Sequence, residues 1–182
     1  MFRAQVQLDR REMAIATRDS LNRAIDRTKT EASRRLRTDY SIKKKDLDKA
    51  FRIFKATVNT QTAELKAQGY PLPVYDFSPR PSDVIRPQPG RGVSVSVKKG
   101  KRALLEGTFI ARMKSGHIGV FARRKTKMMR SKNKKAIKER FAPSVPGMLS
   151  FDEMNKAIRA AAMNYFEIAM DQNVRRFGSR HG

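Results

Sequence analysis

The prolines of this chain are concentrated in one segment, and this concentration limits the fold more than any other feature of the sequence. Six of the eight prolines lie between Gly69 and Gly92. Proline fixes the backbone φ angle and lacks an N–H group, so this density excludes regular helix and favours an extended, Pro-rich loop or arm over residues 69–92. Helices are therefore expected on either side of this segment and not through it.

The first part of the chain, residues 1–55, is predicted to be helical. Apolar and small side chains recur every three or four residues, as on one face of a helix that ends near Asp39. Ser41 fits the N-cap of a second, shorter helix. Acids are interleaved with the arginines of the first helix, which predicts that part of its charge is paired on a solvated face. The predicted buried stripes are Leu21, Ile25, Thr28, Ala32 and Leu36 in the first helix, and Leu47, Ala50, Phe51 and Phe54 in the second.

The middle part, residues 56–122, is predicted to form a small antiparallel sheet of three to four strands next to the Pro-rich arm. Valines alternate with polar residues over positions 93–97, which is the period of a half-buried strand. Residues 107–113 and 118–122 fit a hairpin around a Gly-containing turn. The Thr- and Val-rich residues 56–66 are a further candidate strand.

The clearest local prediction is a long C-terminal helix over residues 150–177. Ser150 and Glu153 have the spacing of a capping box, and Gly178 is a typical stop signal. All these elements together predict one α+β domain over residues 1–182. The stripe expected to be buried on the C-terminal helix is Met154, Ile158, Ala161, Tyr165, Ile168 and Gln172, and this face is widened by Ala157, Ala162, Phe166 and Ala169.

The charge of the chain is strongly positive and unevenly distributed. The chain holds 41 basic and 17 acidic residues, a net charge of +24, and residues 123–140 alone hold ten basic residues and one acid. Such a segment repels itself and gains from an anionic partner, so we interpret it as a basic loop that binds DNA or an acidic protein surface. The alternative is a solvated loop between two elements. No aromatic residue lies among these cations, which argues against base stacking. The candidate binding residues are Arg123, Arg124, Lys125, Lys127, Arg130, Lys132, Lys134 and Lys135.

Catalytic and metal-binding motifs are not found in the sequence. There is no cysteine, and the two histidines, His117 and His181, are not spaced as metal ligands. Walker loops, dinucleotide fingerprints and nucleophile elbows are also absent. Asp76, Asp83 and Glu106 are the carboxylates that a metal site would need, but turn capping and solubility explain them more simply. We therefore expect no enzyme activity, no catalytic residue, no metal site and no cofactor.

The sequence also gives no sign of a membrane segment. No stretch approaches the roughly 18 apolar residues of a membrane-spanning helix. Residues 1–11 are mostly polar and lack the apolar segment of a signal peptide. We expect a protein that makes no membrane contact and is assembled in the cytoplasm.

Three blocks of the sequence resemble one protein family. Residues 50–53 read AFRI, residues 107–121 read GTFIARMKSGHIGVF, and residues 137–148 read IKERFAPSVPGM. The last two are similar to the blocks G-x-F-I-A-x-M-x-S-G-H-x-G-V-F and I-x-x-x-x-G-P-S-V-P-x-M of the prophage minor tail protein Z family, the tail-completion proteins of lambda-like and related phages. Ala142 stands in place of the family's Gly. The order and spacing of the blocks fit the family over nearly the full length.

The resemblance implies a structural virion protein that completes the tail of a phage at the head–tail junction, or neck. It implies other tail and neck proteins as partners, a homo-oligomeric ring, for which tail symmetry suggests a hexamer, and double-stranded DNA in the lumen. It also implies the virion as the final location, after assembly in the host cytoplasm. The alternative function from composition is a stand-alone basic protein that binds nucleic acid without sequence specificity.

The same resemblance assigns structural roles to the blocks. Gly116 and Gly119 are expected to allow the hairpin turn and a close approach of strands. Pro143 and Pro146 are expected to orient the chain where it enters the C-terminal helix. The residues expected to pack the sheet on the helices are Phe109, Val120 and Phe121.

Overall fold

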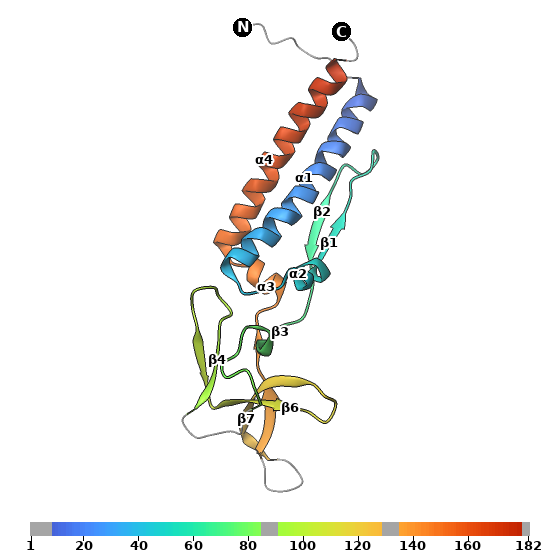
Figure 1. Cartoon of the computed structure of the whole chain (residues 1–182). Coiled ribbons are helices and arrows are strands. Elements are labelled where there is room, and N and C mark those ends of the chain that lie inside the picture. Colours follow the sequence, from blue (N-terminus) through green and yellow to red (C-terminus); the bar gives the residue numbers. More distant parts are fainter. Residues whose placement is uncertain (1–8, 85–90, 129–134, 180–182) are drawn as a thin grey trace. The chain divides into compact units, whose positions relative to one another are not determined.

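The protein is α+β and divides into two compact units. The computed structural model describes residues 9–84, 91–128 and 135–179, with the backbone alone for residues 124–128 and 135. Unit 1 comprises residues 1–35, 47–68 and 149–182, and unit 2 comprises residues 36–46 and 69–148, so each holds 91 residues. Helices and small antiparallel sheets occur together, which confirms the predicted class (Figure 1).

Unit 1 is built on two long antiparallel helices, α1 (Arg10–Asp39) and α4 (Asp152–Gly178), which lie side by side (Figure 1). A buried polar contact joins them: Asn173 Nδ2 donates to Ser20 Oγ over 2.8 Å. The Ser20 hydroxyl in turn donates to the Ala16 carbonyl oxygen over 2.6 Å. Because Ser20 and Asn173 are buried, these bonds satisfy groups whose burial would otherwise be costly.

The buried line of α1 consists mainly of small side chains at every fourth position, and the predicted stripe is partly wrong. Thr28, Ala32 and Leu36 are buried as expected, whereas Leu21 and Ile25 are only half-buried. Small side chains let helix backbones approach closely, so positions with little hydrophobic signal form the contact. The buried residues that the prediction missed are Ala16, Ser20 and Ala24.

The buried face of α4 also departs from the prediction at its C-terminal half. Ile168 and Gln172 are exposed, and the buried residues are Ala169, which was expected on this face, and Asn173 and Phe177, which were not. The same close contact explains the burial of Asn173, because its side chain bonds to Ser20 there. The predicted capping box is wrong as well. The N-cap residue is Phe151, without a side-chain cap, because the short helix α3 (Val145–Leu149) comes just before it and α4 starts later.

A β-hairpin completes unit 1. Strands β1 (Phe51–Phe54) and β2 (Glu64–Ala67) pair antiparallel, with Phe51 opposite Ala67. The predicted strand over 56–66 is therefore wrong for most of its length, and Phe51 and Phe54 belong to a strand and not to the second helix. That helix, α2 (Lys44–Ala50), ends before them. Asn22 fixes the hairpin to α1, because its side chain donates to the Ala56 carbonyl (3.0 Å) and accepts from the Ala56 N–H (2.7 Å).

Unit 2 is a set of short antiparallel pairs and not the one sheet that was predicted. Within the described residues, β3 (Leu72–Pro73) pairs with β9 (Phe141–Ala142), and β4 (Gly92–Val95) pairs with β5 (Ala103–Glu106). A three-stranded sheet contains β6 (Thr108–Arg112), β7 (Ile118–Met128) and β8 (Lys135–Glu139) in that order. The chain has no long stretch of alternating residues here, so each sheet stays small.

The predicted hairpin over residues 107–122 is confirmed as β6 and β7. Gly116 provides the turn with φ of +84°. Phe109 lies opposite Phe121, with ring centroids 6.4 Å apart, and Ile110 lies opposite Val120. All four side chains are buried, so both faces of this hairpin are covered.

The described part of the Pro-rich segment, residues 69–84, packs into unit 2 and is not simply an extended arm. Val74 begins the 3-10 turn η1 (Val74–Asp76), and Phe77 follows it; both are buried. Arg80 forms a two-way backbone pair with Ser94. The remaining prolines at 87 and 89 lie outside the described residues. Ser41 is not the N-cap of α2, because the helix begins at Lys44 and the Ser41 N–H donates to the Val97 carbonyl.

Candidate nucleic-acid interface

The basic segment 123–140 forms a β-hairpin over most of its length, which corrects the predicted loop. β7 continues to Met128, and β8 begins at Lys135. Arg123 lies opposite Ile137, and the register shifts between Arg123 and Met128. The strands pair at Arg123 and again at Met128, so repulsion between cations does not prevent them from forming.

The structure places five of the eight predicted binding residues on this hairpin. Arg123, Arg124, Lys125 and Lys127 belong to β7, and Lys135 is the first residue of β8. Arg123 is exposed, and its guanidinium carbon lies 5.6 Å from the centre of the Phe109 ring. This contact anchors the start of the basic segment on the buried pair Phe109 and Phe121. The other three predicted residues, Arg130, Lys132 and Lys134, lie outside the described residues.

The single acid of the segment, Glu139, contacts a histidine and not one of the neighbouring cations. Glu139 Oε1 lies 2.9 Å from His117 Nε2, which comes from the turn between β6 and β7. Gly119 leaves the space for this carboxylate, since a Cβ atom there would lie 2.5 Å from Glu139 Oε1. In the described parts of the chain, no ion pair joins Arg123, Lys138 or Arg140 to an acid. The positive charge of the hairpin is therefore not neutralised from within.

The contact between His117 and Glu139 was not predicted, because it depends on the strand register that brings residues 117 and 139 together. The expected role of Gly119 in a close approach is in keeping with this geometry, although the neighbour is a side chain and not a backbone.

Further cations of unit 2 lie at the turns of its other hairpins. The turn between β4 and β5 carries four basic residues, and the end of β6 with its turn carries Arg112 and Lys114. Arg102 has a structural role, because its Nη1 donates to the carbonyls of Ser78 (2.9 Å) and Ser94 (3.0 Å). Unit 2 as a whole has 23 basic and six acidic residues, a net charge of +17.

Nothing in the described residues forms a metal site of the usual kind. They contain no group of three or more His, Asp or Glu side chains placed to hold an ion. Asp76, one of the weak candidates, lies 3.8 Å from Lys43 Nζ. None of the helices in the described residues has both the length and the apolar character that a membrane span requires.

Comparison with protein families gives a match that covers residues 3–178. Comparisons with curated proteins and with solved structures give no match. The matched family is described as prophage minor tail protein Z (GPZ), and the match extends over nearly the whole chain, including both units and the basic hairpin. The chain therefore belongs to the prophage minor tail protein Z (GPZ) family, whose members are minor proteins of the phage tail.

Proposed function

We propose that this chain completes a phage tail at its junction with the head, where its basic hairpin contacts the backbone of double-stranded DNA. Family membership supports the broader part of this function, a structural role in the tail of the virion. The finer part, the position at the neck and the contact with DNA, rests on the charge of unit 2. We propose no catalytic activity for the chain.

The observation that carries the proposal is the excess of positive charge on the hairpin of β7 and β8. Ten basic residues lie in 18 positions, and their one acid is bonded to His117. Cations placed against phosphates release the counterions of DNA, and this release drives binding without reading the sequence. The nearby rings of Phe109 and Phe121 are buried, so they do not offer a surface for base stacking. These features favour contact with the phosphate backbone.

We further propose that several copies of the chain form a ring, with six copies in keeping with tail symmetry, and that other tail and neck proteins bind above and below it. A ring would place several basic hairpins around one DNA duplex. The summed attraction would then be large even where each contact is weak.

The test is to locate the protein in purified particles by cryo-electron microscopy, together with a label on the subunit. A ring of six copies at the top of the tail, with residues 123–140 facing the lumen, is the expected result. Absence of the protein from the particle would reject the tail-completion function. It would favour the alternative, a stand-alone protein that binds nucleic acid without sequence specificity.

A further inference from the structure

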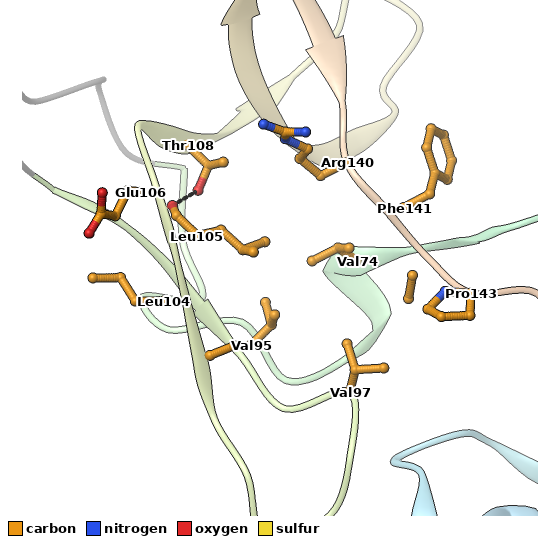
Figure 2. Close-up of a pocket in the computed structure, with 12 residues that line it drawn as sticks. Val74, Val95, Val97, Leu104, Leu105, Glu106, Thr108, Arg140, Phe141 and Pro143 are labelled. Atoms are coloured by element: carbon orange, nitrogen blue, oxygen red, sulfur yellow. Dashed lines mark hydrogen bonds between the residues drawn. The ribbon is translucent and has the colours of Figure 1, made fainter. Parts of the chain in front are cut away.

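An open apolar groove lies in unit 2 beside β5. It has a volume of about 660 Å³ and lies between β4 and β5 on one side and η1 and β9 on the other (Figure 2). Figure 2 shows Leu105, Val74 and Val95 around the groove, whereas Leu104 and Glu106 project from the opposite face of β5. The groove therefore offers an apolar surface along one face of a strand.

β5 is also the edge of its sheet. Among the described strands it pairs with β4 alone, so its other edge is open to a further strand. Leu104 is 56% exposed, which is high for a large apolar side chain in a folded unit. An open edge next to an apolar groove is the arrangement that binds an extended segment by strand addition, in which the backbone gives affinity and alternate side chains fill the groove.

A segment of this chain has the matching pattern. In residues 2–8, Phe2, Ala4, Val6 and Leu8 alternate with Arg3, Gln5 and Gln7. Such alternation is typical of a strand with one apolar and one polar face. We propose that residues 2–8 of one copy add to the edge of β5 of a second copy, with the apolar side chains in the groove.

Charge complementarity favours an antiparallel register with Arg3 opposite Glu106. Arg3 is the charged residue of the segment, and Glu106 has no ion pair within the described residues. In this register Ala4 lies opposite Leu105, on the groove side. Gln5 then lies opposite the exposed Leu104, on the outer face. One register therefore places the apolar side chains on the groove side and Arg3 opposite Glu106.

The length of the following helix favours a second copy over the same chain. Residues 1–9 precede α1, which has 30 residues and so extends about 45 Å. Nine extended residues reach about 30 Å. The last residues of α1, from Leu36 on, belong to the unit that holds the groove. The inference rests on the self-association of the proposed ring and names one contact that would hold it.

The absence of cysteine allows a direct test with full-length chains. A chain with Gln5→Cys is mixed with a mass-tagged chain with Leu104→Cys under mild oxidation. A mixed disulfide can then form only between copies, and directly opposed strand residues are close enough to form it. The control partner carries Val84→Cys, because Val84 is 55% exposed and lies outside the groove.

We expect the mixed disulfide with Leu104→Cys to form at least about tenfold faster than with Val84→Cys, since proximity raises the effective concentration. Arg3→Glu should slow it, and adding Glu106→Arg to the partner should restore it. Equal rates for Leu104→Cys and Val84→Cys would overturn the inference.

Sedimentation of the wild-type chain separates this contact from the ring itself. If the chain forms oligomers but the two disulfide rates are equal, the ring remains supported and the contact through residues 2–8 is rejected. A monomer with equal rates would count against both.

Discussion

The two units have the same length but use their charge differently. Unit 1 has 18 basic and 11 acidic residues, a net charge of +7, whereas unit 2 has 23 and six, a net charge of +17. In unit 1 the acids lie next to the cations: Glu31 binds both Arg34 and Arg35, and Asp26 lies 3.0 Å from Lys55 Nζ. In the basic hairpin of unit 2, the one acid is bonded to His117.

This difference shows that a basic composition does not by itself identify a binding surface. Exposed ion pairs contribute little to stability, typically less than about 1 kcal/mol each. Their effect in unit 1 is to neutralise the helix surface, which leaves fewer cations to attract an anion. In unit 2, the hairpin residues Arg123, Lys138 and Arg140 have no ion pair within the described residues, so they keep their attraction for a polyanion.

The largest expected effect concerns the packed scaffold of unit 2. Phe77 is 1% exposed, so Phe77→Ala should lower the free energy of unfolding by about 3–5 kcal/mol, because it removes contacts and leaves a cavity. Denaturant unfolding measures this change. Tyr70→Ala is the matched control in the same segment, since Tyr70 is 90% exposed and its loss should cost less than about 0.5 kcal/mol. Equal small effects would mean that residues 69–84 do not pack into the unit that carries the charge.

A smaller effect is expected from the charge pairing of unit 1. The hydrogen bond from Arg34, joined by Arg35, lowers the pKa of the Glu31 carboxyl from 4.5 to about 2. The pairing should therefore stabilise the folded state fully above pH 4.5 and be lost as the pH falls towards 2. Glu31→Gln should lower Tm slightly at neutral pH, and this difference should vanish near pH 2.

The control for this experiment is Glu167→Gln, because Glu167 is an exposed acid of α4 in no described ion pair. It should lower Tm less than Glu31→Gln does at neutral pH, because it removes no described ion pair. A Glu31→Gln difference that stays constant from pH 7 to pH 2 would show that the charge of Glu31 does not stabilise the helix.

The parts of the fold that the sequence predicted are those set by local chemistry. Gly116 and the flanking apolar residues predicted the β6–β7 hairpin, and the end of α1 near Asp39 followed from its pattern. The pairing of charge on α1 was also confirmed, because acids and arginines three or four residues apart meet on one helix face.

The parts that could not be predicted depend on contacts between distant residues. The buried residues Ala16, Ser20 and Ala24 have almost no hydrophobic signal. The partner of Ser20, Asn173, lies in another helix and cannot be inferred from the sequence of α1. The strands of the basic hairpin have no clear alternation, so they were predicted as a loop. The engagement of Glu139 by His117 follows only from the strand register.

The central claim, that the cations of the unit 2 hairpin bind DNA while those of unit 1 do not, is tested by the salt dependence of DNA binding. Two full-length variants are compared, each with six basic residues replaced by Gln and so with a net charge of +18 instead of +24. The hairpin variant changes Arg123, Arg124, Lys125, Lys132, Lys134 and Lys135. The control variant changes exposed unit 1 residues that are in no described ion pair: Arg10, Arg11, Lys49, Arg52, Lys156 and Arg159.

Both variants should fold, as circular dichroism would show. The slope of log K against log salt changes by about 0.9 for each phosphate contact. The hairpin variant should therefore lose up to about five units of slope and most of its affinity, whereas the control should lose less than about one unit. Equal losses in the two variants would contradict the account, because the total charge, and not its placement on the hairpin, would then determine binding.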